Sequence, residues 1–184
     1  MVRESAVDFI IRETDEVLVS HAGLALAGAL LQRTDLRARL NGIRLGERRR
    51  PEVPHGDLLT AMIGLLCLGK SGYADIEAVR REEFFRRALG LAKLPSEETL
   101  RQRMDELGTT PIAILHEESA EMILRHAPAL TACYDEWLPL DIDVSPFDNS
   151  GSKKEGVAWT YKKLDGYAPN FAYLAEEGYL LHCE

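Results

Sequence analysis

Two aspartates one residue apart, Asp141 and Asp143, have the residue type and spacing to hold a metal ion. They lie in the stretch Trp137–Ser145, where apolar residues alternate with polar ones as in a strand with one apolar face. In such a strand both carboxylates point to the same side, about 7 Å apart. Burying them is costly unless a cation neutralises them, and Mg²⁺ prefers oxygen ligands. The pattern indicates a metal site, and the alternative is a surface strand whose acids face water.

The loop after this strand changes from turn-forming residues to positive charge. Residues that favour turns occupy Pro146–Gly151, and Lys153 and Lys154 follow closely. An acidic strand end followed by a basic loop is a composition suited to a site that handles a metal ion and a phosphate together. The whole segment is therefore the most informative part of the chain for function.

The most basic stretch is Arg33–Arg50, which contains seven arginines and ends in Arg48, Arg49 and Arg50. A solvated helix end with its loop is one interpretation, and a patch that contacts phosphates is the other. The net charge of −8 is not typical of a DNA-binding protein, but this objection to the second is weakened because residues 111–184 carry the whole excess, with 5 basic and 13 acidic residues. DNA contact at this stretch predicts an affinity that falls steeply with salt, less so after the three consecutive arginines are replaced by alanine.

Other sequence patterns point away from chemistry. The segment Gly64–Ser71 matches a phosphate-binding loop, but its Leu and Cys side chains continue a helical face, so we expect a helix that ends at Gly69 with Lys70 beside it. The five histidines and three cysteines never share a metal-ligand spacing, so no zinc site is expected.

Apolar periodicity predicts helices first and strands last, an α+β order. Strands are expected at Trp137–Ser145 and in a hairpin whose turn is Glu176–Gly178. We expect five short helices, over residues 22–40, from about 58 to 68, 75–89, from a Ser96 cap onward, and 111–127.

Length and composition restrict the class of protein. A chain of 184 residues with 46% apolar and 28% charged residues is expected to form one globular domain or two small ones. It contains no CxxC pair, no signal peptide and no apolar run long enough for a membrane span, so we expect a cytoplasmic location without disulfides or membrane contact.

Two families carry acid pairs of this kind. Asp141–Ser145 resembles the Asp-x-Asp motif of haloacid-dehalogenase-type phosphatases, in which the first acid would be the nucleophile; that motif normally opens its fold. The closer resemblance is to the DDE transposases of bacterial insertion sequences. It is carried by three stretches, the last of them the most specific: Gly72–Gly90, Leu94–Arg103 and Leu140–Leu181.

The resemblance implies a helical, DNA-binding region over residues 1–130 and the start of an RNase H-like catalytic domain over residues 131–184. In that family three acids hold two metal ions, here expected to be Mg²⁺, and one ion activates the attacking oxygen while the other stabilises the leaving oxygen. Asp143 matches the first acid best, with Asp141 in reserve. The remaining residues expected to contact DNA are Lys153, Lys154, Arg101, Arg103, Arg48, Arg49 and Arg50.

The expected partner is the DNA of element ends, with no small-molecule cofactor, and a homodimer is left open. The remaining acids of the chain match neither the second Asp nor the Glu of the family. We therefore expect a truncated, catalytically incomplete transposase that does not cut DNA alone. Two alternatives are a phosphotransferase built on Asp141 and Asp143, and a DNA-binding module without enzymatic activity.

Overall fold

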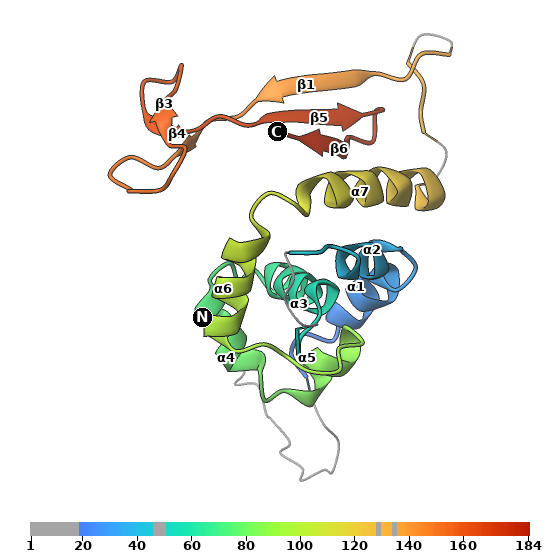
Figure 1. The fold of residues 1–184 in the computed structure, drawn as a ribbon. Helices are drawn as coiled ribbons and strands as arrows, with labels where there is room; N and C mark the ends of the chain where they lie inside the picture. The colour runs from blue at the N-terminus through green and yellow to red at the C-terminus, as the bar shows by residue number, and fades with distance from the viewer. Residues whose placement is uncertain (1–18, 46–50, 128–129, 134–135) are drawn as a thin grey trace, which may run out of the picture.

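The computed structural model describes residues 19–45, 51–127, 130–133 and 136–184. In this part of the chain helices come first and strands last, which confirms the expected α+β organisation (Figure 1). The helices are α1 (Leu24–Leu31), α2 (Leu36–Asn41), α3 (His55–Cys67), the short 3₁₀ turn η1 (Tyr73–Asp75), α4 (Ile76–Val79), α5 (Glu83–Ala88), α6 (Glu97–Leu107) and α7 (Ile112–His126). The strands are β1 (Leu140–Val144), β2 (Phe147–Asp148), β3 (Ala158–Trp159), β4 (Asp165–Tyr167), β5 (Asn170–Leu174) and β6 (Tyr179–Cys183).

The helical part has its own hydrophobic core, built around α3. Leu58 and Leu65 of this helix are fully buried, and Phe85 from α5 and Leu100 from α6 join the same cluster. Burying each such side chain contributes about 1.5–3 kcal/mol to the free energy of unfolding. Among the described residues, every member of this buried cluster lies between Leu24 and Leu107. The strands therefore pack outside the core of the helices.

The prediction of a single helix over residues 22–40 is wrong. The chain forms α1 and α2 with a turn between them, and the Thr34 hydroxyl donates to the Leu31 carbonyl at 2.7 Å in that turn. A Thr side chain that bonds a nearby backbone carbonyl offers the chain an alternative to continuing the helix. The break lets Leu24 and Leu36 both be buried, on two different helices.

The prediction of one helix over residues 75–89 is also wrong, because α4 and α5 are separated by Glu82 in an extended conformation. Val79 and Phe85 lie on either side of this break and are both buried. In one continuous helix these residues, six positions apart, would lie about 120° apart around the axis. The break brings both side chains to the core.

The expected helix ends are confirmed at two places. Helix α3 ends at Cys67, Gly69 adopts a φ of +71°, and the Lys70 amide donates to the Leu65 carbonyl at 3.0 Å. This geometry closes a helix, so the resemblance of the segment to a phosphate-binding loop is accidental. Ser96 caps α6, since its hydroxyl accepts from the Thr99 amide at 3.2 Å.

Helix α7 connects the helical core to the strands. On one side Arg39 of α2 donates to Glu118 at 3.0 Å and also pairs with Glu117. Glu118 is 5% exposed and also accepts from a backbone amide of the α1–α2 turn. On the other side α7 packs against β6, where the rings of His116 and His182 lie 4.1 Å apart between centroids. Glu118 and His116 therefore hold α7 between two layers.

The strands form two small antiparallel sheets. The first has the order β1-β5-β6, and the β5–β6 hairpin confirms the predicted turn at residues 176–178. A register shift between Ala172 and Tyr173 marks a bulge in that hairpin. The second sheet has the order β2-β4-β3. It follows directly from the end of β1 and projects away from the helices (Figure 1).

Strand β1 is the edge of its sheet that is farthest from α7 (Figure 1). It is shorter than the stretch predicted for it. Its apolar side is also not covered by the described residues, since Leu140 is 54% and Ile142 is 63% exposed. The apolar face predicted for this strand is therefore exposed in the described structure.

In the described residues, no helix is long and apolar enough to cross a membrane.

Candidate functional site

Strand β1 presents its two aspartates on one face of the first sheet. In the register with β5, Asp141 lies opposite Tyr173 and Asp143 lies opposite Phe171. Because side chains two residues apart in a strand point to the same side, both carboxylates share this face, as their spacing predicted. Both aspartates are exposed, so their charges face solvent within the described structure.

Aromatic side chains surround the aspartates on this face. Phe171 and Tyr173 stack with ring centroids 6.2 Å apart and planes at 25°. Phe147 of β2 meets the edge of Phe171 at 6.2 Å and 77°. Offset and edge-on arrangements of this kind are the favourable ones for aromatic pairs. The acid pair therefore borders a row of rings on its own sheet face.

Asp143 lies closer than Asp141 to the junction between the two sheets. The Ser145 hydroxyl donates to the Asp143 carboxylate at 3.4 Å, and the Ser145 amide donates to the Pro169 carbonyl at 3.1 Å. The Tyr161 hydroxyl donates to the carbonyl of Val144 at 3.1 Å. These bonds fix the backbone on the C-terminal side of Asp143. The sequence analysis missed Tyr161, whose only signal was its place in an aromatic and lysine-rich segment.

The basic loop lies on the second sheet. The Asn149 amide donates to the Asp165 carbonyl at 2.9 Å, and Lys154 donates to the Asn149 side chain at 3.3 Å. Asp148 accepts from the Ser150 amide at 2.8 Å, and hydrogen bonds from Ser150 hold the pKa of the Asp148 carboxyl below its usual value. These bonds hold the beginning of the loop, and near its end the Tyr167 hydroxyl donates to the Glu155 carbonyl at 2.7 Å. The structure brings no lysine of this loop into an ion pair with a described acid.

The donor set at β1 fits part of a divalent-metal site. Two carboxylates on one strand face are the oxygen ligands that hard cations prefer. Within the residues that the structure describes, however, no group of three or more His, Cys, Asp or Glu side chains could hold a metal ion. Asp141 and Asp143 are thus two of the several carboxylates that a two-metal centre needs.

The arginines expected to contact DNA differ in their surroundings. Arg101 is exposed on α6, whereas Arg103 turns inward. Arg103 donates to Glu106 at 2.7 Å and lies 3.1 and 3.3 Å from the two ring nitrogens of His55. These contacts favour a structural role for Arg103, which the sequence analysis did not distinguish from DNA binding. Arg48–Arg50 lie outside the described residues.

The pKa of His55 is shifted by this arrangement. It lies at the beginning of α3 and is 6% exposed. Burial lowers the pKa of the His55 imidazole, and the positive charge of Arg103 lowers it further, while Glu106 opposes the effect. His55 is therefore kept neutral near pH 7 and positions the Arg103 side chain.

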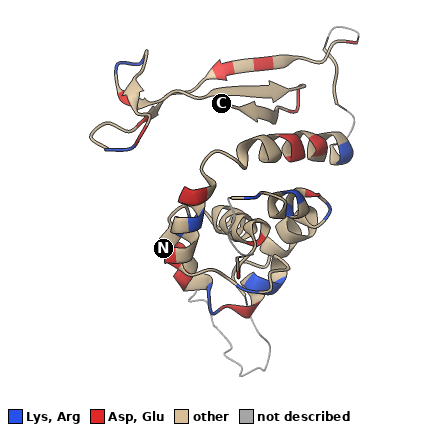
Figure 2. Ribbon diagram, in the orientation of Figure 1, with Lys and Arg blue, Asp and Glu red and all other residues tan. Residues whose placement is uncertain are grey.

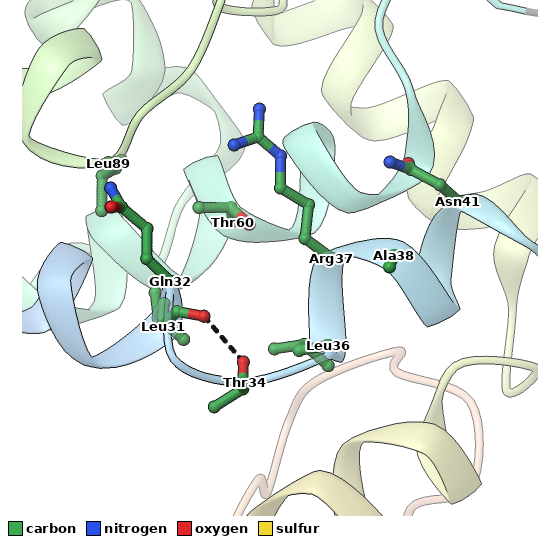
Figure 3. Close-up of a pocket in the computed structure, with 9 residues that line it drawn as sticks. All are labelled: Leu31, Gln32, Thr34, Leu36, Arg37, Ala38, Asn41, Thr60 and Leu89. Carbon is green, nitrogen blue, oxygen red and sulfur yellow. Dashed lines mark hydrogen bonds between the residues drawn. The ribbon is translucent and has the colours of Figure 1, made fainter.

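A pocket of about 380 Å³ opens in the helical part, away from the aspartates (Figure 3). It lies between the α1–α2 turn, Thr60 of α3 and Leu89. Its charged residue, Arg37, already donates to Asp57 at 2.6 Å and to the Gly90 carbonyl at 2.8 Å. These bonds hold α2 against α3 and occupy the Arg37 side chain. The pocket therefore supplies no group to the site at Asp141 and Asp143.

Comparison with known families shows which family the chain belongs to. A family model described as transposase DDE domain group 1 matches residues 8–184. The chain belongs to this family. Comparison with the curated proteins and with the solved structures found no significant match.

Membership of the transposase DDE domain family has direct consequences for the site. Transposases act on DNA, and DDE transposases use divalent metal ions, so an acidic strand pair is a feature expected in such a chain. The match includes the helices as well as β1 to β6. The phosphotransferase alternative based on Asp141 and Asp143 is left without support.

Proposed function

We propose that this chain takes part in DNA transposition by binding DNA and by supplying Asp143 as the first acid of a divalent-metal site. The family match over residues 8–184 is the observation that carries the proposal. The position of the acid pair on the edge strand β1 adds to it, because an edge strand leaves room for further groups beside the carboxylates.

Asp143 is preferred to Asp141 because of the backbone around it. The bonds of Ser145 and of the Val144 carbonyl restrict the end of β1, so the backbone that carries the Asp143 side chain is held in place. Asp141 lies two residues farther from this junction. Both acids lie in the β1–β5 ladder, and the carboxylate with the additional restraints loses less freedom on binding a metal ion.

The chain's own residues would bind and orient DNA at this site. Metal ions, when bound, supply activation of the attacking oxygen and stabilisation of the leaving oxygen. Lys153 and Lys154, exposed on the second sheet, and Arg101, exposed on α6, are the side chains proposed to contact phosphates. Arg48–Arg50 are proposed as further phosphate contacts. We propose Mg²⁺ as the metal and an RNase H-like arrangement for the catalytic part.

The metal-binding role can be tested with paramagnetic Mn²⁺, which broadens the NMR signals of nearby backbone amides. In the ¹⁵N-labelled chain, low Mn²⁺ concentrations should broaden amides of β1 and of its neighbour β5. Asp143→Asn should remove most of this broadening, and Asp141→Asn should weaken it. Asp148→Asn is the matched control, because Asp148 is an exposed aspartate on the adjacent β2. Broadening that survives both β1 substitutions would contradict the proposed site.

A further inference from the structure

The β3–β4 hairpin is a compact feature of which the proposed function uses only the bond from Tyr161 to Val144. Its strands are joined by the turn Thr160–Leu164, in which the Thr160 amide and hydroxyl both donate to the Leu164 carbonyl, at 2.9 and 3.0 Å. The Lys163 amide donates back to the Thr160 carbonyl at 2.9 Å, and Lys163 adopts a φ of +60°. The turn is therefore a defined structure that holds its side chains in place.

Positive charge is concentrated on this small sheet. Four of the six lysines of the chain are Lys153, Lys154, Lys162 and Lys163, and no arginine follows Arg125. Figure 2 shows this charge at two places on the second sheet, on the loop after β2 and on the turn after β3. The same sheet also carries Asp148, Glu155 and Asp165, so residues 147–167 bear four positive and three negative charges, whereas β1, β5 and β6 contain no Lys or Arg.

Two exposed aromatic side chains accompany the lysines. Trp159 is 68% exposed at the end of β3, and Tyr161 is 66% exposed in the turn. Aromatic residues of this size bury a large apolar area when they find a partner, so their exposure on one short hairpin is unusual. Lysines beside exposed rings form the combination that binds single strands of nucleic acid, in which rings stack on bases and cations contact phosphates.

The hairpin is fastened to the end of β1. The Tyr161 hydroxyl donates to the Val144 carbonyl at 3.1 Å, one residue after Asp143. Gly166 of β4 permits close packing against β2, since a Cβ at this position would lie 1.9 Å from the Phe147 carbonyl oxygen. Trp159, Lys162 and Lys163 are thus carried by a unit whose position relative to the acid strand is set by a hydrogen bond.

We propose that the β3–β4 hairpin binds an unpaired DNA strand next to the acid strand, with Trp159 stacking on a base and Lys162 and Lys163 contacting phosphates. This inference rests on the proposed function, because it assigns the DNA a place beside Asp143. An unpaired strand fits better than a duplex, since the faces of paired bases are covered by their neighbours in the stack. The lysines supply positive charge that is complementary to the DNA phosphates, which the acid pair does not.

The stacking contact can be measured by tryptophan fluorescence, because the chain has only the two tryptophans Trp137 and Trp159. In a Trp137→Phe variant, addition of a 20-nucleotide oligothymidylate should quench the emission of Trp159. The converse Trp159→Phe variant should show no quenching on the same titration. Trp137 is 77% exposed, so the two residues form a matched pair of surface tryptophans.

The energetic contribution can be measured by fluorescence anisotropy of a labelled oligothymidylate. Trp159→Ala should weaken binding roughly 5- to 150-fold, the range expected when one base–aromatic stack is lost, whereas Trp137→Ala should leave the affinity unchanged. Changing both Lys162 and Lys163 to Ala should lower the slope of log affinity against log salt by about 1.4, at about 0.7 per single-strand phosphate contact. The control is the double substitution of Lys70 and Lys93, the two lysines of the helical part.

The possible outcomes separate this inference from the proposed function. The wild-type chain binds single strands if the proposed function holds. If the Trp159→Ala variant and the Lys162/Lys163 double variant then bind them with the same affinity as the wild type, the hairpin is not the contact, and only this inference is overturned. Equal weakening of duplex and single-strand binding by Trp159→Ala would overturn the preference for an unpaired strand. If the chain binds neither form of DNA at low salt, the proposed function fails with it.

Discussion

At the scale of single residues, the candidate site depends on contacts made by the neighbours of the acids. Asp141 and Asp143 have the same side chain on the same strand face, yet the bonded neighbours Ser145 and Val144 adjoin Asp143. Both acids lie in the paired part of β1, and the side-chain bonds of Ser145 and Tyr161 add restraints on the Asp143 side. The difference between the acids therefore arises from Tyr161 and Ser145.

His55 leads to a prediction about pH. Its folded-state pKa lies below the ordinary value of about 6.5, because burial and the charge of Arg103 disfavour the protonated ring. As the pH falls below about 6.5, His55 binds a proton in the unfolded chain but stays neutral in the folded chain. The free energy of unfolding therefore decreases. We expect urea unfolding to give lower stability at pH 5.5 than at pH 7.5, with a smaller difference in His55→Asn.

The control for this prediction is His126→Asn, since His126 is exposed on the last turn of α7. This variant should keep the pH dependence of the wild type. An unchanged pH dependence in His55→Asn would show that His55 is not the group responsible.

At the scale of elements, the contact of α1 with α5 depends on one glycine. A Cβ at Gly28 would lie 1.8 Å from the Ala88 carbonyl oxygen, which belongs to the backbone and cannot rotate away. Gly28→Ala should therefore lower the free energy of unfolding by about 1–3 kcal/mol or more, measured by urea denaturation, because the two helices must separate.

Gly23 provides the comparison for Gly28, because a Cβ there meets nothing within 4 Å. Gly23→Ala should change the stability by no more than about 1 kcal/mol. Similar losses in the two variants would indicate that conformational entropy, and not the close approach of α1 and α5, determines the effect.

The elements also show how far the sequence could predict the fold. Local signals predicted the Ser96 cap, the helix end at Gly69 and the β5–β6 hairpin correctly, because each depends on residues close together in the chain. The breaks near Thr34 and Glu82 serve contacts with distant residues, so periodicity alone could not reveal them. The second sheet was missed for a related reason, since strands of two or three residues carry no measurable alternation.

The site was predictable to the same extent. Spacing alone placed Asp141 and Asp143 on one strand face. Two other contacts join residues far apart in the sequence: Tyr161 bonds Val144, 17 residues away, and Arg103 contacts His55, 48 residues away. A pattern of neighbouring residues cannot predict contacts at such separations. The exposure of Ile142 could not be predicted either, because it depends on which elements cover β1.

At the scale of the whole molecule, acids and lysines both occur in the strand region, with Asp148, Glu155 and Asp165 among the lysines of the second sheet. The acid pair lies on β1, four lysines lie on the second sheet, and α7 connects both to a helical core (Figure 2). A DNA strand is repelled by the carboxylates of Asp141 and Asp143 unless cations neutralise them. Binding of DNA and of divalent metal at this end of the molecule should therefore support each other.

The same arrangement predicts that the 184-residue chain does not cleave DNA alone. Two-metal phosphoryl transfer needs several carboxylates around both ions, and the described residues bring together no third ligand beside Asp141 and Asp143. Incubation of supercoiled plasmid with the purified chain and Mg²⁺ or Mn²⁺ should leave the plasmid closed, as judged on agarose gels. Asp143→Asn controls for contaminating nuclease. Nicking by the wild type that this substitution abolishes would instead locate the missing ligands in residues outside the described part, and would make Asp143 a catalytic residue of a complete centre.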